Sequence, residues 1–126
     1  MINLTAGDLM RIAGHVIQQP HVRDAGLMEA AAARPQATFD GQPVYGDLVE
    51  MAAALTESLV TNHALVDGNK RLGLAGLLVF LGINGHTVTM SNGEAYDFIY
   101  GIASGQLRGV PEIARQLRPY VLSKQS

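Results

Sequence analysis

One segment of the chain places polar and charged side chains at spacings that could do chemistry. It is residues 62–71, NHALVDGNKR, in which His63 and Asp67 lie four positions apart and Lys70 and Arg71 follow. A histidine can accept the proton of an attacking hydroxyl group. A carboxylate beside phosphates can hold Mg²⁺, which prefers one or two carboxylates together with substrate oxygens. The segment is therefore a candidate site for a phosphate-bearing substrate.

The two cations of this segment fall where a helix is expected to begin. Lys70 and Arg71 directly precede the apolar stretch Leu72 to Ile83. The first turn of a helix has free backbone N–H groups and the positive end of the helix dipole, so it attracts anions. Two cations at such a terminus cost about 0.3–1 kcal/mol each, and a bound phosphate chain would reverse that sign.

Each of these residues also has a purely structural interpretation. His63 alone is typical of a partly buried polar residue, and Asp67-Gly68-Asn69 alone is typical of a turn with a capping residue. A histidine and a carboxylate four apart could bind zinc, but no third ligand follows nearby, and the P-loop pattern GxxxxGK[ST] is missing. The residue types and spacing alone predict only an anion site.

The elements that must position this segment are helical. Apolar residues recur at helical spacing, and capping patterns stand at Thr5/Asp8, at Asp24 and at Ser91/Glu94. The loop over 34–46 contains Asp40-Gly41, a turn signal between short extended pieces. Another extended piece is expected over 86–90. The predicted helices span about 6–18, 24–33, 47–61, 72–83, 95–102 and 111–117.

The stretch 72–83 is apolar all round, which predicts a central helix buried on every face. Gly73, Gly76 and Gly82 each cost about 1 kcal/mol of helix propensity relative to alanine, so we expect them to permit close approach of neighbouring helices. The resulting fold class is a compact all-α bundle of about six helices, a single domain over residues 1–126, with a short hairpin and a buried central helix.

Composition excludes several classes of function. The 126 residues are 48% apolar and 16% charged, with nine basic and eleven acidic residues, a net charge of −2, and a pI near 6.0. No basic cluster exceeds Lys70-Arg71, so direct nucleic-acid binding is not expected. The absence of cysteine excludes disulfides and thiolate zinc sites. No apolar run reaches the ~20 residues of a membrane span, and the first residues lack a signal-peptide pattern, so a cytoplasmic location is expected.

The run from His63 to Arg71, HALVDGNKR, resembles the signature HxFx[D/E][G/A]NKR of the Doc branch of the Fic family. Residues 23–45 resemble the flap region of Doc, and LLVFLGINGHTV, residues 77–88, is similar to the helix and short strand that follow the motif. The similarity covers nearly the whole chain. It implies a Fic/Doc-like helical bundle that binds ATP at the N-terminus of the motif helix.

The resemblance also implies a reaction. Most Fic relatives carry HxFx[D/E]GNGRxxR and transfer AMP, whereas this chain has Lys70 at the second motif glycine and Leu74 at the last arginine. Both departures match Doc, in which the nucleotide binds in reverse. Doc transfers the γ-phosphoryl group to a threonine of translation elongation factor Tu and so arrests translation. The cofactors expected from this resemblance are ATP and Mg²⁺.

Site roles follow from the same resemblance. His63 would be the general base that accepts the threonine proton, and Asp67 would coordinate Mg²⁺. Lys70 and Arg71 would act in catalysis by neutralising charge on the transferring group. The phosphate-binding set would be Gly68, Asn69, Lys70 and Arg71, with Gly68 supplying a backbone cradle and Asn69 a side-chain donor.

The resemblance further implies two macromolecular partners. The target would be elongation factor Tu, held in extended form by strand addition along the flap residues Gln36, Ala37, Thr38 and Phe39. An antitoxin of the Phd type would block the site, which makes the chain the toxin of a type II toxin–antitoxin system. The inhibitory pattern [S/T]xxxE[G/N] of self-inhibited Fic proteins is missing from the sequence, so inhibition from another chain is expected.

Two alternatives stay open at this point. One is AMP transfer to a protein hydroxyl, as in most Fic proteins. The other is a catalytically silent module that binds a nucleotide or a partner, because Leu65 replaces the motif phenylalanine. We expect Leu65 to keep the anchoring role in the core, with looser packing than the aromatic ring would give.

Overall fold

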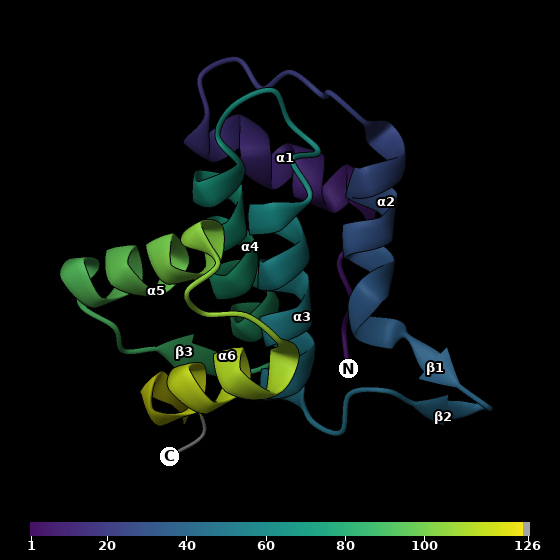
Figure 1. Cartoon of the computed structure of the whole chain (residues 1–126), viewed down its shortest axis with the longest axis vertical. Helices are drawn as coiled ribbons and strands as arrows, with labels where there is room; N and C mark the ends of the chain where they lie inside the picture. Colours follow the sequence, from purple (N-terminus) through teal and green to yellow (C-terminus); the bar gives the residue numbers. More distant parts are fainter. Residues whose placement is uncertain (125–126) are drawn as a thin grey trace.

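The fold is a bundle of α-helices with α4 at its centre (Figure 1). The computed structural model describes residues 1–124. Helix α4 packs most extensively against α3 and also contacts α1 and α5. The mostly helical fold class and its six α-helices agree with the sequence prediction. Their bounds are α1 (Ala6–Val16), α2 (Ala25–Ala33), α3 (Leu48–Thr61), α4 (Asn69–Ile83), α5 (Asn92–Ser104) and α6 (Val110–Leu117).

Side chains cap the N-termini of α1, α2, α3 and α5. The capping boxes predicted at Thr5/Asp8 and at Ser91/Glu94 both form, each with two reciprocal hydrogen bonds. Such caps satisfy N–H groups that have no partner inside the helix. Helix α4 differs, because no side chain within the described residues caps its N-terminus.

Helix α1 is shorter than predicted. It ends at Val16, two residues before the expected end, and Ile17 adopts an extended conformation with φ −127° and ψ 130°. The apolar spacing of Ile17 continues the helical pattern, but its side chain packs against Gly68 at the start of α4. Tertiary packing therefore decides the end of this helix.

Helix α4 is not buried on every face, so that prediction is wrong. Leu72, Leu77 and Leu81 are fully buried, but Leu78 is 44% exposed and Ile83 is 39% exposed. The neighbouring helices therefore cover α4 incompletely.

Two of the three α4 glycines permit close helix packing, as predicted. A Cβ atom at Gly73 would lie 2.4 Å from Val60 Cγ2, and one at Gly76 would lie 2.8 Å from Leu59 Cδ1. Both neighbours belong to α3. The prediction is wrong for Gly82, where the nearest atom would be Lys124 Nζ at 3.7 Å.

Two pairs of short strands complete the fold. Strands β1 (Thr38–Phe39) and β2 (Gln42–Pro43) form the expected hairpin, and its turn residues Asp40 and Gly41 both have positive φ. Strand β3 (His86–Val88), also expected, pairs antiparallel with β4 (Val121–Ser123), which the sequence pattern did not reveal. Short 3₁₀ helices occupy Arg34–Gln36 and Arg118–Tyr120. Within residues 1–124, no helix has the length and hydropathy needed to cross a bilayer.

Candidate phosphate-transfer site

The polar residues of the predicted site line one open cleft at the N-terminus of α4. Its volume is about 510 Å³. Three apolar residues complete its wall: Ile17 at the end of α1, Val60 of α3 and Ala103 of α5. The sequence analysis did not predict these three as part of the site. The predicted residues on the cleft are His63, Asp67, Gly68, Asn69, Lys70 and Arg71.

The cleft exposes the uncapped end of a long helix. The first N–H of α4 with an intrahelical acceptor is that of Leu72, which donates to the Gly68 carbonyl at 2.9 Å. The backbone N–H groups of Asn69, Lys70 and Arg71, in the first turn of α4, are free for a ligand in such a geometry. Lys70 and Arg71 are exposed beside them. Dipole, amides and two cations therefore act together to favour an anion.

Gly68 permits the sharp entry of the chain into α4. Its φ is 89°, and a Cβ atom there would lie 2.4 Å from Ile17 Cδ1. The Gly68 N–H donates to Asp67 Oδ1 at 2.8 Å, which orients the exposed Asp67 carboxylate at the mouth of the cleft. In this structure the Gly68 N–H is thus already bonded to a carboxylate. The backbone N–H groups expected to contact a phosphate are therefore those that follow Gly68.

Asn69 holds the loop instead of pointing at the cleft with a free amide. Its Oδ1 accepts the Leu65 N–H at 3.1 Å, and its Nδ2 donates to the Leu65 carbonyl at 3.0 Å. Residues 62–68, which connect α3 to α4, form the motif loop. Leu65 is fully buried, as expected for the residue that anchors this loop. The side chain assigned to phosphate binding by resemblance therefore serves the loop.

The composition of the cleft suits Mg²⁺ held together with phosphates. Asp67 is the carboxylate on its wall. No group of three metal-ligating side chains occurs in the described part of the chain, so residues 1–124 offer no closed cage of protein ligands. Because Mg²⁺ commonly takes one or two carboxylates and completes its shell with phosphate oxygens and water, a single carboxylate beside an anion site fits that ion.

A second, more apolar groove adjoins the cleft and shares Lys70 and Arg71 with it. It has a volume of about 420 Å³ and lies between α4 and α5. Tyr96 and Tyr100 stack on its wall with ring centroids 5.9 Å apart and an interplanar angle of 11°. Exposed aromatic faces of this kind accept planar or apolar groups. Sequence reasoning missed these two residues, although their spacing of four on a helix was a usable signal.

The hairpin assigned to the target lies away from the cleft. Gln36, Ala37, Thr38 and Phe39 precede α3, whereas His63 follows it, and α3 has 14 residues. That length corresponds to about 21 Å. Figure 1 shows the hairpin at one end of α3 and the α3–α4 connection at the other. The structure therefore does not bring these four residues to His63.

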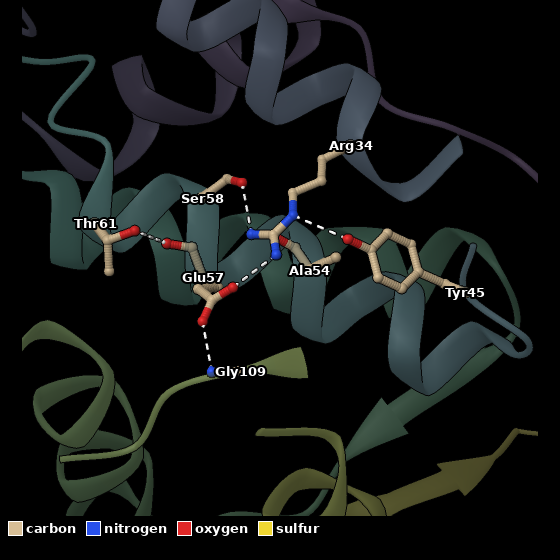
Figure 2. Close-up of polar contacts among 7 residues, drawn as sticks. All are labelled: Arg34, Tyr45, Ala54, Glu57, Ser58, Thr61 and Gly109. Atoms are coloured by element: carbon tan, nitrogen blue, oxygen red, sulfur yellow. Dashed lines mark hydrogen bonds and ion pairs between the residues drawn. The ribbon is translucent and has the colours of Figure 1, made fainter. Parts of the chain in front are cut away.

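A partly buried arginine fixes the base of that hairpin (Figure 2). Arg34 donates to the Tyr45 hydroxyl at 3.1 Å and to Ser58 Oγ at 3.1 Å, and its Nη2 lies 2.7 Å from Glu57 Oε1. The second Glu57 oxygen accepts the Gly109 N–H at 2.8 Å. Burial opposes the charge of Arg34, but the Glu57 and Tyr45 contacts outweigh it and raise the pKa of Arg34.

The sequence model of the Fic/DOC family matches residues 3–81, which include the motif loop and nearly all of α4. The chain belongs to the Fic/DOC family. This finding confirms the resemblance inferred from the motif between His63 and Arg71.

Two relatives narrow the similarity to the Doc branch of this family. "Toxin Doc" of Mycolicibacterium smegmatis is 59% identical over 64 residues, which are 51% of this chain and 49% of the relative. "Protein kinase doc" of Escherichia phage P1 is 33% identical over 99 residues, 79% of this chain and 76% of the relative. The match thus spans about half the length of the first relative and about three quarters of the second.

Proposed function

We propose that this chain is a Doc-type toxin that transfers the γ-phosphoryl group of ATP to a threonine of translation elongation factor Tu. The observation that carries the proposal is the convergence of His63, Asp67, Lys70 and Arg71 on one cleft at an uncapped helix N-terminus. The names of the two relatives, a toxin and a protein kinase, support the same activity.

The proposed reaction is a direct phosphoryl transfer. The threonine oxygen forms a bond to the γ-phosphorus while the bond from that phosphorus to the β–γ bridging oxygen breaks. The bridging oxygen leaves with the electron pair as part of ADP, and His63 accepts the proton of the hydroxyl group. The products are phosphothreonine and ADP.

The other site residues position the phosphates and stabilise their charge, which is most of what a protein contributes to such a transfer. Lys70, Arg71 and the first-turn amides of α4 would bind the phosphate oxygens. Asp67 would hold Mg²⁺, which supplies further neutralisation of the phosphate charge when bound.

Lys70 is the residue that favours phosphoryl transfer over the AMP transfer of other Fic proteins. It occupies the position of a motif glycine, at the helix N-terminus where a phosphate would otherwise sit. A side chain there favours the reversed nucleotide, with the γ-phosphate next to His63. The variant Lys70→Gly should therefore move part of the activity toward AMP transfer.

The decisive test uses ATP labelled at either the α- or the γ-phosphate, incubated with the protein and elongation factor Tu. We expect label from the γ position only, on threonine, and none with His63→Ala. His15→Ala, which removes an exposed histidine of α1, is the matched control and should keep full activity. Label carried only from the α position would establish AMP transfer instead.

The toxin role has its own test in cells. Expression of the chain in the cytoplasm should arrest cell growth. Co-expression of a Phd-type antitoxin should relieve the arrest. His63→Ala should abolish toxicity. Unchanged toxicity of this variant would favour a silent binding module, which acts without catalysis.

A further inference from the structure

The motif loop that carries His63 is held from the side by the connection between α1 and α2. We name residues 21–24 of that connection the strap. Its backbone pairs antiparallel with the loop: the Arg23 N–H donates to the Ala64 carbonyl at 2.8 Å, and the Val66 N–H donates to the His21 carbonyl at 2.9 Å. The Asp24 N–H adds a bond to Ala64 at 3.1 Å.

The side chain of Arg23 reaches the backbone of His63 itself. Its Nε donates to the His63 carbonyl at 2.6 Å, and its Nη2 donates to the Asn62 carbonyl at 3.3 Å. Asn62 is the C-cap residue of α3. Carbonyl groups at a helix C-terminus carry partial negative charge and attract a cation. The guanidinium therefore spans two successive carbonyls where α3 turns into the motif loop.

The backbone at His63 needs such support. Its φ is 56°, in the left-handed region that side chains other than glycine occupy at a cost. A conformation of this kind is unfavourable for such a side chain and persists only where the surroundings hold it. The conformation sets the direction in which the imidazole leaves the chain, and His63 lines the cleft.

We infer that Arg23 is a positioning residue for the proposed reaction: its guanidinium holds the left-handed backbone of His63, so that the imidazole is presented to the hydroxyl of the target. The inference rests on the proposed function for its effect on catalysis. Its structural part, the hold of Arg23 on the loop, stands on the hydrogen bonds alone and is measured separately.

The kinetic test compares Arg23→Gln and Arg23→Lys with a matched control. Arg108→Gln is that control, because Arg108 Nε likewise donates to a carbonyl at a helix C-terminus, that of Gly105 at 2.9 Å. A displaced base lowers the rate of the chemical step, so we expect Arg23→Gln to lower kcat about ten- to a hundredfold while the KM for ATP changes little. Arg23→Lys keeps the charge and one donor and should fall between. A kcat of Arg23→Gln equal to that of Arg108→Gln would overturn the inference.

The structural test needs no activity. In Arg23→Gln, the Cα and Cβ chemical shifts of His63 should move away from left-handed values, and the Val66 amide should exchange with solvent at least about tenfold faster. The Thr89 amide, which is bonded to the Tyr120 carbonyl far from the loop, should not change. Unchanged His63 shifts and Val66 exchange would overturn the inference. If the unaltered chain transfers no phosphate, the proposed function fails while this measurement still decides the role of Arg23.

Discussion

The side chain of Asn69 makes two hydrogen bonds to the backbone of Leu65, one accepted from the N–H and one donated to the carbonyl. They connect the first turn of α4 to the buried anchor of the motif loop. Because the loop carries His63 and the turn carries Lys70 and Arg71, these two bonds fix the position of the proposed base relative to the two cations that we propose to bind phosphate.

Asn69→Ala should therefore weaken both stability and activity. It leaves a buried N–H and a buried carbonyl without partners, at about 1–3 kcal/mol for each unsatisfied group. Asn69→Asp keeps the acceptor but places a carboxylate against the Leu65 carbonyl, so it should be no better. Urea unfolding measures the loss. An Asn69→Ala protein as stable as the unaltered chain would contradict the structural role.

The variant Arg34→Gln should lower the free energy of unfolding by more than the loss of an exposed ion pair does. Arg34 connects Tyr45, Glu57 and Ser58, and its removal leaves the partly buried Glu57 without its cation, at a cost of about 1–3 kcal/mol. Arg118→Gln, which breaks the exposed pair with Asp47, is the matched control and should cost under about 1 kcal/mol. Equal losses in urea unfolding would show that the Arg34 network contributes no more than a surface pair.

Gly73→Ala and Gly14→Ala should have opposite signs. A Cβ atom at Gly73 would lie 2.4 Å from Val60 Cγ2, so α3 and α4 would have to separate, and overpacking of this kind costs about 1–3 kcal/mol. At Gly14 in α1 nothing lies within 4 Å of the new atom, so alanine should stabilise by up to about 1 kcal/mol. Thermal unfolding of the two variants checks both signs. A stabilised Gly73→Ala protein would contradict the close packing.

The fold should lose stability in acid through its capping carboxylates. Hydrogen bonds lower the pKa of Glu94; the bond from the Ser91 N–H contributes most and the bond from the Tyr120 hydroxyl comes next. The pKa of Asp47 is lowered mainly by the hydrogen bond from the Glu50 N–H and further by Arg118. A carboxyl group with a lowered pKa in the folded state stabilises the fold above its unfolded pKa. That contribution disappears as pH falls through the folded pKa, so the urea midpoint should drop below about pH 4.5. Glu94→Gln should reduce this drop; a curve parallel to that of the unaltered chain would contradict it.

The helices and much of the site could be predicted because their signals are local. The capping pairs Thr5/Asp8 and Ser91/Glu94 are three residues apart, and they form as the sequence indicates. The site residues from His63 to Arg71 are consecutive in one loop and the helix turn that follows. Chain connectivity therefore keeps them close together, although distant segments complete the wall of the cleft.

The features that escaped prediction depend on contacts between distant segments. Strand β4 pairs with β3 over more than thirty residues of intervening chain, and Arg23 reaches the carbonyl of His63, forty positions along the chain. The hairpin at Thr38 and Phe39 was predicted to hold the target in extended form, and the sequence did not indicate that α3 would place it at the end opposite to His63. Periodicity identifies a helix but does not say which end of it faces a ligand.

The central claim is that the N-terminus of α4 and the preceding loop together bind a triphosphate. A crystal structure with a non-hydrolysable ATP analogue and Mg²⁺ tests it most directly. We predict phosphate oxygens bound to the first-turn amides of α4 and to Arg71, the metal ion at Asp67, and the γ-phosphorus nearest to the His63 imidazole. Phosphates bound elsewhere, or an imidazole turned away from the bound phosphorus, would contradict the account.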